Sequence, residues 1–173
     1  ALRRGAYDYI LKDRPDRLGQ AVQHALEQKK LRAERMRAEE ALQREQYLMR
    51  TLLDTVPDVI YFKDTQSRFI RVNPAHARKF GAARPEELIG KNDADFFGPD
   101  HAQSAYDDEQ QIIQSGNPLI NIEELETYHD REPGWVSTTK MPLRDQNGEI
   151  VGTFGISRDI TERKLAEKQL LET

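Results

Sequence analysis

The chain has 173 residues, of which 37% are hydrophobic and 32% charged, and its formal net charge is −4. The absence of cysteine excludes disulfides, cysteine-bound metal centres, cysteine nucleophiles and the cysteinyl–flavin adduct of light sensors. The sequence also lacks an apolar run of about 18 residues and a signal-peptide pattern, so we expect a cytoplasmic location and no membrane partner.

Charge is unevenly distributed along the chain. Residues 1–50 hold 12 Lys and Arg against 8 Asp and Glu, whereas residues 51–173 hold 14 against 22. Because contacts to phosphate need clustered cations, the acidic main body predicts no nucleic-acid partner. In the basic part, Glu residues interleave with Arg, which indicates a solvated helix surface more than a binding stripe.

The segment from Asp16 to Val56 contains no proline and one glycine, and it is rich in strong helix formers. We therefore expect one long helix, or two helices that abut. From residue 31 onward, a heptad pattern places apolar residues at five of seven seam positions. The seam positions hold Leu31, Glu34, Ala38, Ala41, Glu45, Leu48 and Leu52. This thin seam predicts a homodimeric coiled coil, and the alternative is a single solvated spacer helix.

Residues 56–161 alternate short apolar runs with turn residues. Five runs predict strands, at residues 59–62, 69–72, 119–128, 135–142 and 150–158. Short helices are expected from Asn73-Pro74 and from Pro85, and a longer one from about His101 to Ser115. This order of elements predicts an α+β fold, in which helices cross one face of a five-stranded antiparallel sheet.

Motifs spread over the segment from Leu52 to Leu165 resemble those of Per-Arnt-Sim (PAS) sensor domains. They are Val56-Pro57-Asp58, Asp64, Val72-Asn73-Pro74, Gly81, Glu86-Glu87-Leu88-Ile89-Gly90, Pro142-Leu143, Asn147-Gly148-Glu149, Gly152-Thr153-Phe154-Gly155 and Asp159-Ile160-Thr161. The resemblance implies a PAS-like sheet with short helices on one face, between the long N-terminal helix and a short C-terminal output helix.

The Asp159-Ile160-Thr161 motif is similar to the signature at which PAS sheets pass into an output helix. In that family the Asp and the Thr tie the last strand to the helix, so the resemblance assigns signal coupling to Asp159 and Thr161. Independently of the family, such side chains satisfy free backbone N–H groups at a helix N-terminus and fix its exit angle. A local cap without a signalling role is the alternative.

Residues 1–30 resemble the last strand and last helix of a response-regulator receiver domain. Lys12 matches the lysine that contacts the phosphoryl group in receivers, while the phosphoacceptor aspartate of such a domain would lie upstream. A strand without its sheet has no stable partner, so we expect residues 1–11 to be disordered, rebuilt or paired across chains. The expected organisation is a receiver remnant (1–30), a linker or coiled-coil helix (31–55), a PAS domain (56–161) and the start of an output helix (162–173).

The resemblance also implies a pocket between the inner sheet face and the helices, with nine apolar candidates to line it. They are Ile60, Phe62, Ile70, Val72, Phe80, Phe97, Ile113, Phe154 and Ile156. The alternative is that these side chains fill the core and enclose no small-molecule ligand. Haem is disfavoured because His101 lies at or before the start of the long helix and no histidine falls inside it. The histidines form no spaced set, so no metal site is expected.

The sequence contains no Gly-x-Ser-x-Gly elbow and no phosphate-binding loop, so we expect no enzyme activity in these residues. The resemblances imply a signal-transduction sensor or relay module, dimeric, that links a receiver domain to a downstream output domain in a two-component phosphorelay. One alternative is a regulatory fragment of a sensor histidine kinase or diguanylate cyclase, with its catalytic domain outside this chain. Another is an unliganded dimerisation spacer.

Overall fold

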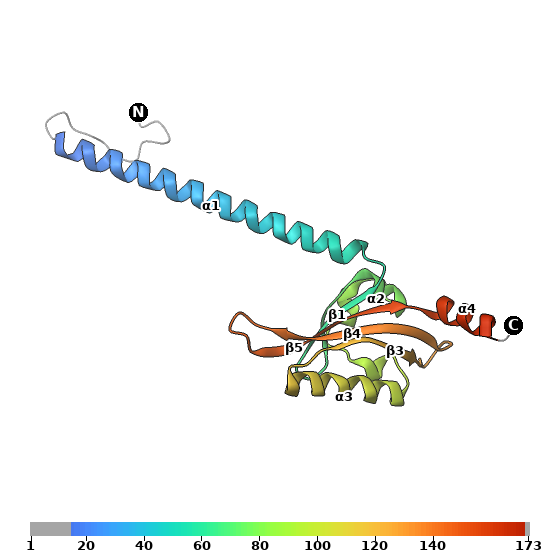
Figure 1. Cartoon of the computed structure of the whole chain (residues 1–173). Coiled ribbons are helices and arrows are strands. Elements are labelled where there is room, and N and C mark those ends of the chain that lie inside the picture. The colour runs from blue at the N-terminus through green and yellow to red at the C-terminus, as the bar shows by residue number, and fades with distance from the viewer. Residues whose placement is uncertain (1–14, 172–173) are drawn as a thin grey trace. The chain divides into compact units, whose positions relative to one another are not determined.

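The computed structural model describes residues 15–171, and its first element is the long helix α1 (Pro15–Thr55) (Figure 1). The 41 residues form one continuous helix, which crosses the expected boundary at residue 30 without a break. The chain divides into two compact units, residues 1–50 and 51–173, so α1 begins in the first unit and ends in the second. Along the heptad seam, Leu31, Leu48 and Leu52 are 54%, 51% and 54% exposed.

Five strands form one antiparallel sheet in the order β2-β1-β5-β4-β3. They are β1 (Val59–Asp64), β2 (Phe69–Val72), β3 (Leu119–Glu126), β4 (Gly134–Arg144) and β5 (Ile150–Asp159). The predicted α+β fold, with its five-stranded antiparallel sheet, is confirmed. The first and last parts of the folded segment, β1 and β5, pair at the centre of this sheet.

Two aspartates form the tight turns of the sheet. Asp64 accepts hydrogen bonds from the backbone N–H groups of Gln66 and Arg68, at 2.9 and 3.0 Å, and so turns β1 into β2. Asp145 accepts in the same way from Asn147 and Glu149, at 2.8 and 3.0 Å, in the turn between β4 and β5. These side chains replace backbone partners, which is why Asp favours such turns.

The remaining helices are short except for α3, and those between β2 and β3 lie on one face of the sheet. They are α2 (Pro74–Lys79), the 3₁₀ turns η1 (Pro85–Leu88) and η2 (Asp93–Asp95), α3 (Pro99–Ser115) and α4 (Thr161–Leu171). Figure 1 shows α3 running across the sheet, where it contacts β3, β4 and β5. Gly116, with φ 72°, ends α3 in the left-handed conformation that glycine adopts without strain. Only α4 follows the sheet, at its C-terminal end.

Asn73 joins the start of β1 to the start of α2. Its side-chain oxygen accepts from the backbone N–H groups of Ile60 and His76, each at 3.0 Å, and its amide donates to the carbonyl of Asp58 at 2.9 Å. The Asn73 side chain is fully buried, and all these bonds are satisfied inside the protein. The apolar core beside it consists of Tyr61, Phe69, Val72, Ala77 and Leu88.

The described helices are too short or too polar to cross a membrane, α1 included. Residues 1–14 and 172–173 lie outside the described part of the chain, and with them Lys12 and the expectation for residues 1–11.

Candidate functional site

A small cavity of about 30 Å³ lies between the inner face of the sheet and the helices. Space of this size holds about two water molecules. Strands β1, β3, β4 and β5 form its sheet wall, and residues of α2, η2 and α3 close it. Unlike an ordinary core cavity, it is lined by many charged side chains: Lys63, Lys79, Asp93, Glu109, Glu124, Glu126 and Lys140.

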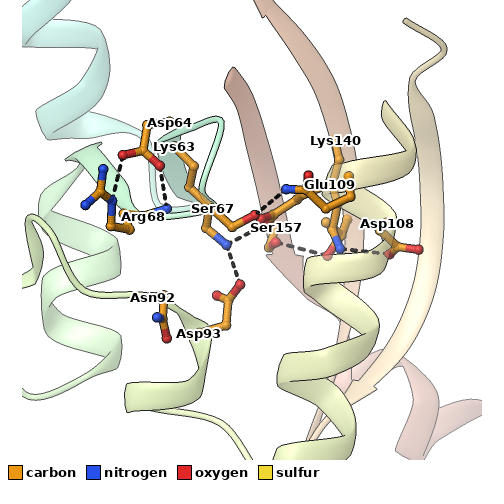
Figure 2. A network of polar contacts seen from close by, with 12 residues as sticks. Lys63, Asp64, Ser67, Arg68, Asn92, Asp93, Asp108, Glu109, Lys140 and Ser157 are labelled. Atoms are coloured by element: carbon orange, nitrogen blue, oxygen red, sulfur yellow. Dashed lines mark hydrogen bonds and ion pairs between the residues drawn. The ribbon is translucent and has the colours of Figure 1, made fainter. Parts of the chain in front are cut away.

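Lys63 of β1 is the centre of the charged lining (Figure 2). Its ammonium group donates to Asp93 of η2 and to Glu109 of α3, with Nζ 2.6 Å from Glu109 Oε1. The Lys63 residue is 1% exposed. Burial by itself lowers the pKa of Lys63, but the two carboxylates outweigh it and hold this pKa above its usual value. The ammonium group also lies over the rings of Tyr61 and Phe69, 5.1 and 4.8 Å from their centroids.

Two buried polar atoms that belong to lining residues have no hydrogen-bond partner among the described residues: Glu109 Oε2 and His76 Nδ1. Burial raises the pKa of Glu109, and Lys63 opposes that effect. Burial, with the nearby Lys79 and Lys63 charges, lowers the pKa of His76 to about 3. His76 is therefore a neutral imidazole at physiological pH.

A second buried cation extends the charged lining to β4. Lys140 Nζ lies 2.9 Å from Asp108 Oδ2, and the Lys140 residue is 4% exposed. Asp108 and Glu109 are adjacent on α3, so this helix is bound to β4 through the first and to β1 through the second (Figure 2). Helix α3 is thus tied to two strands by charges that also line the cavity.

A third ionic group closes the cavity where α2 meets the end of β3. Glu126 accepts hydrogen bonds from Lys79 and from the Tyr128 hydroxyl. Burial and the Glu126 charge raise the pKa of Tyr128, which keeps its hydroxyl protonated as a donor. The Arg131 guanidinium lies 4.8 Å from the centroid of the Tyr128 ring.

The start of α4 is bound to β4 by backbone and side-chain hydrogen bonds. Asp159 Oδ1 accepts from the Thr161 N–H at 2.8 Å, and Thr161 Oγ1 accepts from the Trp135 N–H at 2.9 Å. The Ile160 N–H donates to the Trp135 carbonyl at 2.9 Å. The predicted tie between the last strand and the helix is therefore present, while its role in signalling stays a prediction.

Charged side chains hold the first turn of α4 on β3 as well. Glu123 of β3 pairs with both Arg163 and Lys164, with Lys164 Nζ 2.5 Å from Glu123 Oε2. Hydrogen bonds from Lys164 and Arg163 lower the pKa of Glu123. Lys164 Nζ also lies 5.3 Å from the centroid of the Trp135 ring. Helix α4 is therefore in contact with the same two strands that line one side of the cavity.

The structure brings only two of the nine apolar pocket candidates to the cavity, Phe80 and Phe97. The predicted placement of the others at the cavity is corrected. Ile60, Phe62, Phe154 and Ile156 lie on the opposite face of the sheet, where Phe62 stacks on Phe154 with centroids 5.7 Å apart. Val72 belongs to the apolar core, Ile70 is 47% exposed, and Ile113 is half-buried away from the lining.

The prediction of pocket residues chose the wrong face of strand β1. Side chains alternate between the faces of a strand, so the choice of Ile60 and Phe62 selected the outer face of β1. The inner face carries Val59, Tyr61 and Lys63. A lysine inside the apolar run of β1 was the one sequence signal for this charged lining, because lysine is rarely buried unless paired.

The placement of His101 also differs from the prediction. Helix α3 begins at Pro99, so His101 lies within its first turn and not before it. Its ring lines the cavity, 4.6 Å from the Phe97 ring centroid. The argument against haem that rested on the position of His101 is therefore withdrawn.

Residues 53–165 match the family model described as the PAS fold. The chain belongs to this PAS family. Over 123 residues it is 33% identical to the methanogenesis regulatory histidine kinase FilI of Methanothrix harundinacea, a match that covers 71% of this chain and 14% of FilI. The chain thus spans a small part of this curated relative, and its homologues include sensor kinases.

Solved structures show the same PAS fold. The PAS domain of BvgS from Bordetella pertussis is 27% identical, with a TM-score of 0.54, and covers 78% of this chain and 99% of that domain. The VqmA–ligand–DNA complex of Vibrio cholerae is 26% identical, with a TM-score of 0.58, and covers 64% of this chain and 49% of VqmA. These similarities support a signalling role for the PAS domain.

The exclusion of a nucleic-acid partner was wrong. It rested on the acidic charge of residues 51–173, yet VqmA, a structural neighbour of this domain, is solved in complex with DNA. A domain of this fold therefore occurs in a DNA-binding protein. The net charge of the domain does not decide which partners the whole protein binds.

Proposed function

We propose that this chain is the sensor and relay module of a dimeric signalling protein, in which the state of the charged cavity is transmitted through the sheet to α4. The single observation that carries the proposal is the double role of β4. Lys140 of this strand lines the cavity, and Trp135 of the same strand holds Thr161 at the start of α4. A strand rises about 3.4 Å per residue, so about 17 Å of one rigid element joins the two sites.

In this proposal, the element that moves is helix α3, through its ion pairs with β1 and β4. A ligand that changes how Lys63 and Glu109 pair alters the position of α3 over β1. The adjacent residue, Asp108, passes the change to Lys140 and so to β4. Such coupling requires two arrangements of α3 whose populations the ligand shifts, and ion pairs that exchange partners provide them.

The proposal places dimerisation in α1. The exposed leucines of its heptad seam have no partner within the described chain, and a second copy of the helix would bury them. The seam contains small and acidic residues, so the helix pair is marginally stable and easily shifted between registers. The alternative is that the domain is an unliganded dimerisation spacer, which the small volume of the cavity favours.

The proposal also sets the chain between other modules. Residues 1–30, which resemble the end of a receiver domain, would connect the sensor to an upstream phosphorylation event. Catalysis would belong to an output module beyond α4, and the similarity to FilI favours a histidine kinase. A diguanylate cyclase and a further PAS domain are alternative outputs, and the similarity to VqmA adds a DNA-binding module.

The experiment replaces Asp159 and Thr161 together by Ala in the intact protein and measures its output with and without stimulus. Loss of the response with intact folding is expected, because both side chains tie β5 and β4 to α4. The matched control is Glu162→Ala, since Glu162 is the exposed next residue. An unchanged response in the double variant removes the joint from the mechanism.

A further inference from the structure

A second hollow, a groove of about 450 Å³, lies between the β1–β2 turn, η2 and the first half of α3. Several of its lining residues are exposed, so the groove is open to solvent. Small-molecule sites typically have volumes of about 300 to 1,000 Å³. The inner cavity, at about 30 Å³, accepts only groups the size of a water molecule. A larger ligand therefore finds room in the groove and not in the cavity.

Two buried residues connect this groove to the charged cavity. Asp93 lines both, and its residue is 8% exposed. One oxygen of its carboxylate accepts from Lys63, and in Figure 2 the other points away from Lys63. Ser67, which is 3% exposed, also lines the groove and donates a hydrogen bond to the Glu109 carboxylate. A ligand in the groove can therefore act on the pairing of Lys63 with Glu109 without entering the cavity.

The charges around the groove favour a cation. Among the described residues, the lining of the groove includes no lysine, arginine or histidine, and its one carboxylate is that of Asp93. Asp93 shares Lys63 with a second carboxylate, so this buried cluster has more negative than positive charge. Arg68 donates to Gln66 of the lining at 3.0 Å, but it already pairs with Asp64. An anion would find no free cation in the lining, whereas a cation at Asp93 would offset the excess charge.

The uncharged side chains of the lining favour a planar group with several donors. Gln103 donates its amide to Asp107 at 2.8 Å, which leaves its side-chain oxygen as an acceptor. Asn92 Oδ1 accepts from the Ala94 N–H at 2.9 Å and has a second lone pair. Tyr106, which is 44% exposed, adds the face of an aromatic ring. A guanidinium group matches this lining, because it is planar, carries five N–H donors, pairs with carboxylates and stacks on aromatic rings.

We propose that the groove binds a small molecule with a guanidinium group, which donates to the Asp93 carboxylate and lies against the ring of Tyr106. This ligand class rests on the proposed sensor function and makes it specific. The bond to the ligand weakens the hold of Asp93 on Lys63, so Lys63 pairs more closely with Glu109 and binds α3 more tightly to β1. That change is the event that α3 would pass to β4.

The first test is a titration of the isotopically labelled chain, followed by NMR, with three probes of similar size. Ethylguanidinium is the planar cation, N-ethylurea has the same planar shape without the charge, and n-butylammonium has the charge without the plane. Saturable shifts centred on the amides of Ala94 and Gln103 are expected with ethylguanidinium at concentrations where the other two probes give none. Equal or tighter binding of N-ethylurea or n-butylammonium overturns the proposal. Unsaturable shifts spread over the whole chain, or no shifts with ethylguanidinium, overturn it as well.

The second test removes the charge of the groove. Asp93→Asn keeps the volume of the side chain and leaves Lys63 paired with Glu109. It is expected to weaken ethylguanidinium binding about tenfold or more, because a charge-assisted hydrogen bond is lost. Asp100→Asn is the matched control: Asp100 is exposed in the first turn of α3, outside the lining, and its loss changes the net charge equally. Unchanged affinity in a folded Asp93→Asn protein, or an equal loss in Asp100→Asn, overturns the proposal.

A further pair of variants protects the test against misfolding, because Tyr106 is largely outside the core. Tyr106→Ala removes the aromatic face and should weaken ethylguanidinium binding several-fold, whereas Tyr106→Phe keeps the ring and should bind as the wild type does. Equal affinity in all three proteins places the guanidinium group elsewhere and overturns the proposal. If ethylguanidinium fails to bind while the Asp159 and Thr161 double variant still loses its output response, the ligand class is wrong and the relay stands.

Discussion

The backbone N–H of Trp135 donates a hydrogen bond to the side-chain oxygen of Thr161, across 2.9 Å, from β4 to the first residue of α4. The Trp135 carbonyl in turn accepts from the Ile160 N–H, so one residue of the sheet holds two consecutive residues of the joint. This contact fixes where the last helix leaves the domain.

Thr161→Ala removes the acceptor for the Trp135 N–H. We expect a loss of about 1 kcal/mol in the free energy of unfolding, typical of one lost intramolecular hydrogen bond. Amide exchange in the first turn of α4 should accelerate. Thr161→Ser retains the hydroxyl and should restore wild-type exchange, measured by hydrogen–deuterium exchange and mass spectrometry. Exchange as slow in Thr161→Ala as in the wild type would show that this bond does not hold the helix.

Lys63→Met leaves Asp93 and Glu109 buried without their cation. Removing one member of a buried ionic cluster costs about 3–5 kcal/mol, because the remaining charges stay desolvated. Urea unfolding should show this loss, and adding Asp93→Asn and Glu109→Gln to Lys63→Met should recover part of it.

The control for Lys63→Met is Arg35→Met. Arg35 pairs with Glu39 on the exposed surface of α1, with Nε 2.8 Å from Oε1, and exposed pairs contribute about 0–1 kcal/mol. A loss for Lys63→Met no larger than that of Arg35→Met contradicts the buried charge network.

Stability should depend on pH through His76. Burial first, and then the charges of Lys79 and Lys63, lower its pKa in the folded protein to about 3, while the unfolded chain protonates near its ordinary value of 6.5. Below that value the unfolded state therefore binds the proton and the folded state does not. Folding stability should fall as pH decreases from about 6.5 toward 3, by about 1.4 kcal/mol per unit.

Comparison with a variant isolates this contribution from those of the carboxylates. Denaturant unfolding of the wild type and His76→Gln between neutral and acidic pH should differ in slope, with the shallower loss in His76→Gln. His24→Gln, on the exposed surface of α1, serves as the control and should keep the wild-type slope. Identical slopes for the wild type and His76→Gln would mean that His76 is not held neutral.

The α1 seam predicts a dimer that separates when its leucines become charged. Light scattering should give a dimer for the wild-type chain and a monomer for Leu31→Asp with Leu48→Asp. Leu42→Asp is the control, because Leu42 is 59% exposed on the same helix but lies outside the seam. A wild-type monomer at high concentration, or equal dissociation by Leu42→Asp, contradicts dimerisation through this seam.

The element order was predictable from the sequence because its signals are local. Asn73 followed by Pro74 indicated the start of α2, and Asn147-Gly148 indicated the turn between β4 and β5. Gly116 likewise marked the end of α3. Each of these residues acts through its own backbone or its immediate neighbours, so no knowledge of distant contacts was needed.

The cavity was not predictable in the same way, because its residues meet only after folding. Lys63 and Glu109 are 46 positions apart, and no pattern in the sequence around either residue indicates that the two will pair. The placement of Tyr61 on the inner face of β1 also depends on a glycine that is distant in the sequence. A Cβ on Gly155 would lie 2.3 Å from the Tyr61 hydroxyl oxygen, so the missing side chain on β5 makes room for Tyr61 on the inner face.

The claim that the cavity communicates with α4 is tested most directly by hydrogen–deuterium exchange of α4 when only the cavity is changed. Ala105→Leu alters the cavity from α3 and leaves the residues of β4 and of the joint unchanged in sequence, and Ala83→Leu, in an exposed loop, is its control. We predict that Ala105→Leu changes the exchange of α4 amides, and that the change disappears when Asp159 and Thr161 are also replaced by Ala. Altered exchange in α3 with unchanged exchange in α4 would contradict the relay.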